Sequence, residues 1–103
     1  MYAVTVEFVA KAGHVETFRT AMIENATLSR EREAGCRQFD VTVDPADPAT
    51  IFLYEIYDDR AAFDAHLPAA HYREFDARTR DWIERKTVRI FMRIDPSHSR
   101  HPL

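Results

Sequence analysis

The spacing of apolar residues switches between two periods along this chain, and the order of the switches limits the folds it can form. Residues 2–10 alternate with a period of two, which predicts a strand. Apolar residues then recur every three or four positions over 14–34, which predicts an amphipathic helix that ends at Gly35. The period of two returns over 36–43 and predicts a second strand.

The second half of the chain repeats the pattern of strand, helix and strand. Asp58 and Asp59 stand where the helical pattern begins and are typical capping residues. Because a proline fits badly inside a helix, Pro68 predicts a bend that divides the helical part in two. The expected elements are a turn over 44–48, a strand over 51–57, helices over 58–67 and 69–85, and a last strand over 87–94.

This β-α-β-β-α-β order predicts an α+β, ferredoxin-like fold, in which helices cover one face of a four-stranded antiparallel sheet. A length of 103 residues suffices for one domain. We expect this domain to cover residues 1–95. Residues 96–103 are expected to form a flexible tail, in which His98 and His101 are solvated.

Two of the expected strands are apolar on both faces. Residues 51–54 read Ile-Phe-Leu-Tyr, and residues 90–92 read Ile-Phe-Met. A strand that is apolar on both sides is normally buried on both sides, but a chain of this length has helices for only one face. A second copy of the chain can cover the other face, so we predict a homodimer packed sheet to sheet.

The charge balance argues against nucleic-acid and membrane partners. The 14 basic and 17 acidic residues give a formal net charge of −3 at pH 7, without the basic footprint that such partners require. No apolar run approaches a transmembrane length, and Met1 leads directly into a strand pattern instead of a secretory signal, so a cytoplasmic location is expected. Cys36 is the only cysteine, which excludes an internal disulfide and favours a small buried apolar side chain.

Three titratable residues are the first candidates for chemistry: Glu55 in an apolar strand, His66 on the following helix and His71 beyond the bend. A buried carboxylate needs a partner or a shifted pKa, and histidine exchanges protons near neutral pH. If the fold brings the three together, they can perform acid–base catalysis. In the structural alternative, Glu55 pairs with Arg89 or Arg93, His66 belongs to the core and His71 has a surface or capping role.

Other side chains are candidates for the walls of such a site. Asn25 lies on the inner stripe of the first helix, where its amide can either donate a hydrogen bond to a substrate oxygen or cap neighbouring backbone. Four aromatic side chains can either line a pocket for a flat ligand or pack in the core: Phe39, Tyr72, Phe75 and Trp82.

Neither a metal site nor a nucleotide site is expected. Two histidines and a carboxylate can bind a metal, but His66 and His71 are separated by Pro68 and lack the spacing of a helical metal pair. The chain contains two glycines, too few for a dinucleotide-binding loop. The charged run over residues 30–33 is interpreted as a solvated helix end.

Several short motifs are specific when taken together in their order and spacing: Asn25, residues 29–36, residues 39–41, residues 54–57, Ala62, Phe63, His66 and His71. Over residues 2–94 the sequence resembles the antibiotic biosynthesis monooxygenase domain. The resemblance implies a dimeric α+β barrel, and similar members include quinol monooxygenases that use neither metal nor flavin. Haem-degrading members carry an asparagine where this chain has Glu7 and a tryptophan where it has His66, so haem breakdown is not expected.

The residues and the resemblance together predict a cofactor-independent monooxygenase that oxidises a small phenolic or quinol substrate with O₂. His66, oriented by Glu55 or His71, would remove a phenolic proton. Asn25 would hold an oxygen atom as charge develops on it.

Two alternatives stay open. The stretch from His66 to Tyr72 is also similar to the isomerase of the phosphorylated autoinducer-2 signal, so the chain could move protons next to a carbonyl. Arg73 and Arg78 would then be candidates to hold the phosphate. A non-catalytic dimeric binding module would instead keep Glu55 in a salt bridge and His66 away from the cavity.

Overall fold

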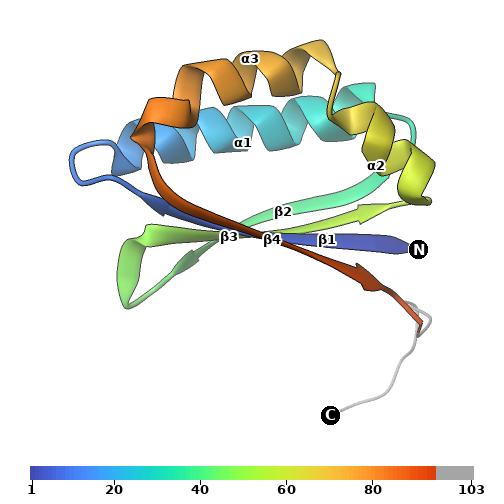
Figure 1. Ribbon diagram of the computed structural model, residues 1–103, viewed down its shortest axis with the longest axis horizontal. Coiled ribbons are helices and arrows are strands. Elements are labelled where there is room, and N and C mark those ends of the chain that lie inside the picture. The colour runs from blue at the N-terminus through green and yellow to red at the C-terminus, as the bar shows by residue number, and fades with distance from the viewer. Residues whose placement is uncertain (95–103) are drawn as a thin grey trace.

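The computed structural model describes residues 1–94, and in it helices cover one face of a four-stranded antiparallel sheet (Figure 1). The predicted ferredoxin-like fold is confirmed. The predicted tail over 96–103, with His98 and His101, lies outside the described residues. In chain order the elements are β1 (Tyr2–Ala10), α1 (Val15–Arg32), β2 (Cys36–Asp44), β3 (Asp47–Tyr57), α2 (Arg60–His66), α3 (Ala70–Thr79), the 3₁₀ helix η1 (Arg80–Trp82) and β4 (Ile83–Met92).

The sheet has the strand order β2-β3-β1-β4, so the first and third strands are central. Val4 of β1 pairs with Glu55 of β3 and with Ile90 of β4. Because paired residues of antiparallel strands point to the same face, Glu55 lies on the side that the helices cover. Arg89 pairs with Thr5 and points to the opposite face. The alternative in which Glu55 pairs with Arg89 is therefore wrong.

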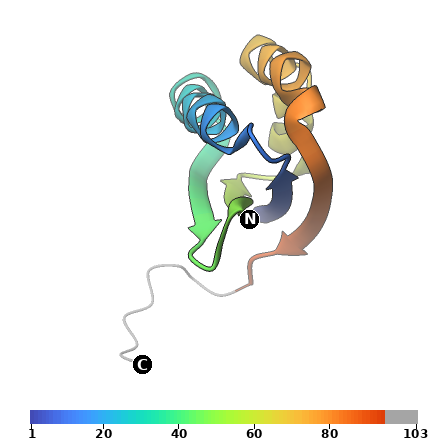
Figure 2. The same ribbon diagram turned by 90° about the vertical axis from the view of Figure 1, so that its left-hand side faces the viewer.

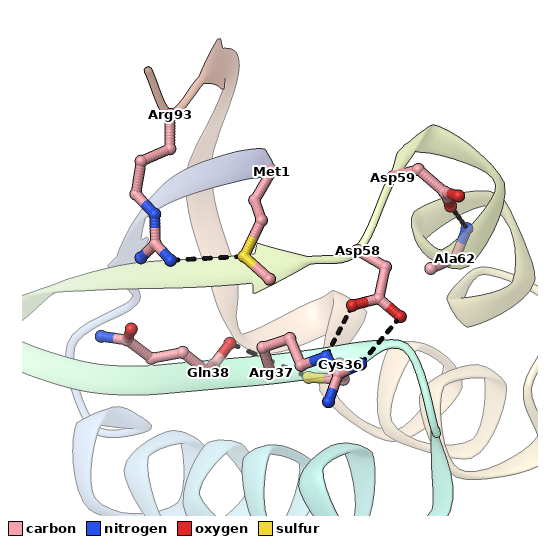
Figure 3. A network of polar contacts seen from close by, with 8 residues as sticks. All are labelled: Met1, Cys36, Arg37, Gln38, Asp58, Asp59, Ala62 and Arg93. Carbon is pink, nitrogen blue, oxygen red and sulfur yellow. Dashed lines mark hydrogen bonds and ion pairs between the residues drawn. The ribbon is translucent and has the colours of Figure 1, made fainter. Parts of the chain in front are cut away.

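Arg93 is not a partner of Glu55 either. Its backbone N–H donates to the carbonyl of Met1, and its guanidinium lies 3.3 Å from the Met1 sulfur (Figure 3). These contacts hold the end of β4 beside the start of β1, on the far side of the sheet from the helices.

The helices lie in two rows above the sheet. Figure 2 shows α1 above the β2 side and α3 above the β4 side. Phe18 and Met22 of α1 and Ile51 of β3 are fully buried where these layers meet. Burial of one such side chain stabilises the fold by about 1.5–3 kcal/mol, so this contact fixes α1 on the sheet. No helix within residues 1–94 is long and apolar enough to cross a membrane.

The last helix ends earlier than its apolar pattern predicts. Helix α3 stops at Thr79, η1 follows, and Ile83 already pairs with Ala10 of β1. The predicted helix over 69–85 is thus wrong in its last three residues, which belong to β4. Pairing with the end of β1 satisfies the hydrogen-bonding groups of their backbone better than another helical turn. β3 likewise begins at Asp47, since the turn before it is short.

Gly35 joins α1 to β2 at a point where the chain comes very close to α2. A Cβ atom at Gly35 would lie 2.5 Å from the Cβ of Ala62, a distance that real Cβ atoms do not show. The carbonyl of Gly35 accepts a hydrogen bond from the Asp58 N–H at 2.9 Å. The glycine therefore lets the end of α1 and the start of α2 pack together.

An ion pair closes the same junction. Figure 3 shows the Arg37 guanidinium on both carboxylate oxygens of Asp58, at 2.5 and 3.3 Å. Asp59 caps α2, as predicted: its side chain accepts from the Ala62 N–H at 2.9 Å. Cys36 is buried, and burial followed by the nearby Glu33 and Glu55 charges raises the pKa of its thiol to about 11. The predicted role as a buried apolar side chain is confirmed.

Candidate active site

A single carboxylate, that of Glu33, lies between the two candidate histidines. Its Oε2 atom is 2.7 Å from Nδ1 of His66 and 2.5 Å from Nε2 of His71. All three side chains are buried or nearly so, with 12% of the Glu33 side chain exposed and 3% and 4% of the histidines. The interpretation of residues 30–33 as a solvated helix end is correct for Arg30, Glu31 and Arg32 and wrong for Glu33.

Each member of this triad stands at the end of an element. Glu33 is the C-cap of α1, His66 is the last residue of α2, and His71 is in the first turn of α3. The break at Pro68 turns the chain between the two helices, so that both imidazoles face the same carboxylate. The close packing of Gly35 on Ala62 brings Glu33 within their reach.

The triad sets the protonation of His66. Burial alone would raise the pKa of Glu33, but the hydrogen bonds and positive charge of His66 and His71 outweigh it and lower that pKa. The carboxylate is therefore ionised at neutral pH and can only accept hydrogen bonds. Nδ1 of His66 is then the donor in this contact, and Nε2 is the ring nitrogen that Glu33 does not occupy. Orientation of a histidine base by a buried carboxylate follows the logic of catalytic triads.

His66 also lines a cavity of ≈ 70 Å³ between the helices and the sheet. A volume of this kind must reach about 10–15 Å³ to hold one water, so the cavity has room for several waters or a single small ring. Most of its wall is apolar, and its polar members are few: Asn25, Glu55, His66, Tyr72 and Lys86. A mainly apolar cavity with convergent polar groups is the usual form of a small-molecule site.

Glu55 is the second titratable acid in this cavity, and it is 3% exposed. It accepts a hydrogen bond from the Tyr57 hydroxyl at 2.6 Å. Burial raises the pKa of Glu55 to about 7, although the Tyr57 hydrogen bond and His66 partly offset it. Burial and the Glu55 charge raise the pKa of Tyr57 as well, so the phenol keeps its proton. Glu55 can thus give or accept a proton near neutral pH.

Asn25 reaches the cavity from α1. It is 3% exposed, and its Oδ1 atom has no hydrogen-bond partner within residues 1–94. A buried amide oxygen without a partner costs about 1–3 kcal/mol, so the position is suited to a ligand that brings a donor.

Three of the four predicted aromatic residues line the cavity, namely Phe39, Tyr72 and Phe75. The ring of Tyr72 is 4.6 Å from the imidazole of His66. Trp82 is not part of this wall: it stacks on His14 at 5.9 Å, near the start of α1. Trp82 lies in η1 and packs, partly buried, against the hydrophobic core.

His71 does not line the cavity, so the structure places it behind Glu33 as the second donor to that carboxylate. The two candidate phosphate ligands also lie elsewhere. Arg73 is exposed on the outer side of α3, and Arg78 pairs with Glu24 at 3.4 Å on the surface.

The triad is chemically suitable for a divalent metal. One ligand atom from each of Glu33, His66 and His71 lies within 4.8 Å of the others. Two histidines and one carboxylate can bind zinc or iron. The carboxylate that lies beside the two histidines is Glu33. The sequence analysis had grouped Glu55 with them instead.

Two residues of the site escaped the sequence reasoning. Glu33 stands directly before the Ala34-Gly35 turn. Its position at a helix end, next to a glycine turn, is the sequence feature that could have identified it as a site residue. Lys86 lies on the helix-covered side of β4, because it pairs with Phe8 of β1. The sequence feature that could have identified Lys86 is its position on the same strand face as the apolar residues Val88 and Ile90.

The match to known proteins extends over most of the chain. Residues 1–78 match the model of the antibiotic biosynthesis monooxygenase family. A solved structure from Nitrosomonas europaea that carries the same family name has 31% sequence identity and a TM-score of 0.87, with 92% of this chain and 100% of that chain covered.

Two further solved structures are similar. A protein from Mycobacterium tuberculosis has 25% identity and a TM-score of 0.85, with 93% of this chain and 97% of that chain covered. One from Deinococcus radiodurans shares the fold, with 18% identity and a TM-score of 0.86, and 98% and 100% of the two chains are covered. The chain belongs to the antibiotic biosynthesis monooxygenase family.

Proposed function

We propose that the protein is a cofactor-independent monooxygenase that oxidises a small phenol or quinol with O₂. One observation carries the proposal: a histidine held by a buried carboxylate lines a ring-sized cavity that also contains an acid with a pKa near 7. Membership of the family supports monooxygenase chemistry in general.

In the proposed reaction, Nε2 of His66 accepts the proton of the substrate hydroxyl. The ionised Glu33 stabilises the imidazolium that forms, as a carboxylate does in a triad. The resulting electron-rich phenolate reduces O₂ itself and so supplies the electrons that a flavin would otherwise provide. One oxygen atom enters the ring and the other leaves as water, so a hydroquinone ends as a hydroxylated quinone.

Glu55 and Asn25 act on the oxygen that becomes reduced. Glu55 gives a proton to the reduced oxygen, which its pKa near 7 permits at neutral pH. The side-chain amide of Asn25 can donate to the developing oxyanion. Preorganised donors of this kind often account for a large part of an enzyme's rate enhancement. Tyr72 and Phe39 hold the ring by apolar contact.

The isomerase alternative uses the same acid and base without O₂. His66 would remove a proton next to a carbonyl and Glu55 would return one to the neighbouring atom. The surface positions of Arg73 and Arg78 give no support for a phosphate in the cavity. The non-catalytic alternative requires a salt bridge at Glu55 and a distant His66, whereas Glu55 bonds Tyr57 and His66 lines the cavity.

The deciding experiment measures oxygen uptake with a panel of hydroquinones, for the native protein and for His66→Ala. His14→Ala is the matched control, because His14 stacks on Trp82 away from the cavity. We expect uptake above autoxidation that His66→Ala abolishes and His14→Ala keeps. Uptake equal to autoxidation, or unchanged in His66→Ala, rejects the monooxygenase, and turnover of the substrate without O₂ supports the isomerase.

We also propose that the working protein is a homodimer packed through the uncovered face of the sheet. That face exposes Phe52 and Phe91, at 39% and 43%. They surround a hollow of ≈ 630 Å³ together with polar side chains such as Glu7 and Arg89. A contiguous apolar patch on a sheet face is a common interaction surface.

A further inference from the structure

Lys86 brings a basic side chain to the cavity that contains His66. Within residues 1–94 it is the only lysine or arginine in the cavity wall. Its Nζ atom lies 3.3 Å from the Tyr72 hydroxyl and 5.5 Å from the centre of the Phe8 ring. The exposed Lys86 side chain therefore lies along the rings of Phe8 and Tyr72, with its ammonium group near the Tyr72 hydroxyl.

In the described part of the chain Lys86 is in no close ion pair, although its charge acts on the Glu55 carboxyl of the same cavity and lowers the pKa of that group. Within residues 1–94 no carboxylate forms an ion pair with it, whereas many of the surface arginines have such a partner. An ammonium group has three donors, and the Tyr72 hydroxyl uses one of them. The remaining donors are available to an anionic oxygen of a ligand.

The position of Lys86 marks the open side of the cavity. Leu67 and Val88 line the same cavity and are exposed at 44% and 47%. β4 is exposed along most of its length. Lys86 thus stands at the mouth of the cavity.

The polar groups at the other side of the cavity have a different chemistry. Asn25 comes from α1, which lies above the β2 side of the sheet, and its amide oxygen has no hydrogen-bond partner within residues 1–94. The same cavity wall contains His66 and Glu55. A ligand that satisfies all of them has a hydroxyl donor inside and an anionic oxygen at the mouth.

We propose that the preferred substrates are phenolic acids: a single aromatic ring with a hydroxyl group facing His66 and a carboxylate facing Lys86. The inference rests on the proposed function and narrows its substrate class. The cavity holds one small ring, so the carboxylate extends toward the mouth. At that end it meets the ammonium group of Lys86.

The test compares two compounds that differ by one charge: hydroquinone and gentisate, which is hydroquinone with one added carboxylate. Isothermal titration calorimetry without O₂ measures binding apart from turnover. A charge-assisted hydrogen bond is worth about 1.5–3 kcal/mol, so we expect gentisate to bind about tenfold tighter or more. The variants are Lys86→Met, Lys86→Arg and the control Lys11→Met, which removes the same charge from an exposed turn.

We expect Lys86→Met to bring the ratio of the two affinities to within about twofold of one, and Lys86→Arg and Lys11→Met to keep the preference. Equal affinities in the native protein overturn the proposal, as does a preference that persists in Lys86→Met. Failure of both compounds to bind also overturns it. If gentisate binds through Lys86 but causes no oxygen uptake, the phenolic-acid site stands and the monooxygenase proposal fails.

Discussion

Nδ1 of His66 lies 2.7 Å from Oε2 of Glu33, although the two residues are 33 positions apart in the chain. The carboxylate is ionised because the two histidines lower its pKa. His66 is therefore held in one tautomer, with its second nitrogen free to act as a base. The same oxygen accepts from His71, so the triad joins the ends of three helices.

The first prediction concerns the role of Glu33 as the residue that orients His66. Glu33→Gln should lower kcat for oxygen uptake by about a hundredfold or more, because an amide no longer enforces the tautomer of the imidazole. KM should change much less. Glu31→Gln is the control, since Glu31 is exposed on the same helix end. Equal kcat values in the two variants, with circular dichroism showing native folding, would contradict the role.

The second prediction concerns the buried acid Glu55. Its pKa of about 7 in the folded protein lies above the ordinary 4.5, so the folded state binds its proton more tightly than the unfolded state does. The contribution of Glu55 to the free energy of unfolding should therefore be fully present below pH 4.5, and should fall by about 3 kcal/mol as the pH rises to about 7. Glu55→Gln should remove most of this fall.

Urea denaturation at pH 4.5 and pH 8 measures the change. Glu84→Gln serves as the comparison, because Glu84 is exposed on β4. A fall in stability that is as large in Glu55→Gln as in the native protein would show that another group causes it.

The third prediction concerns the junction that places Glu33. Gly35→Ala should destabilise the fold by about 1–3 kcal/mol, because the added methyl group overlaps the Cβ of Ala62. The double variant Gly35→Ala with Ala62→Gly removes the overlapping atom and should recover much of the loss. Thermal or urea unfolding measures both, and no recovery in the double variant would place the strain elsewhere.

The fourth prediction concerns the uncovered face of the sheet. Phe52→Glu should convert a dimer to a monomer in sedimentation velocity, because a charge in the middle of an apolar interface cannot be solvated. Ile23→Glu is the matched control: Ile23 is 56% exposed on α1 and lies outside this face. A monomeric native protein, or a Phe52→Glu variant that still dimerises, argues against this interface.

The fifth prediction concerns metal. The triad of Glu33, His66 and His71 can accept a divalent ion, but in the proposed reaction Nδ1 of His66 keeps its proton for Glu33. Treatment with EDTA should therefore leave oxygen uptake unchanged, and added Zn²⁺ should inhibit it by competing for the imidazoles. Loss of activity in EDTA that returns with one added metal would assign the site to that metal instead.

The local pattern was enough to predict the arrangement of strands and helices. Alternation over 2–10 and 36–43 and helical spacing over 14–34 depend on neighbours in the chain, and the structure has these elements within a few residues. The end of the last helix could not be predicted in this way. Ile83 follows a helical pattern but pairs with Ala10, more than seventy residues earlier in the chain.

The pattern along the chain was enough to identify His66, Glu55 and Asn25 as candidate site residues, because they interrupt apolar patterns. Which of these side chains lie together depends on tertiary packing. In the structure Glu33 is the partner of the two histidines, Trp82 lies outside the cavity wall, and Lys86 lies at its mouth. The physical reason is that periodicity reports the face on which a side chain lies, whereas the contact between two faces depends on how distant segments pack.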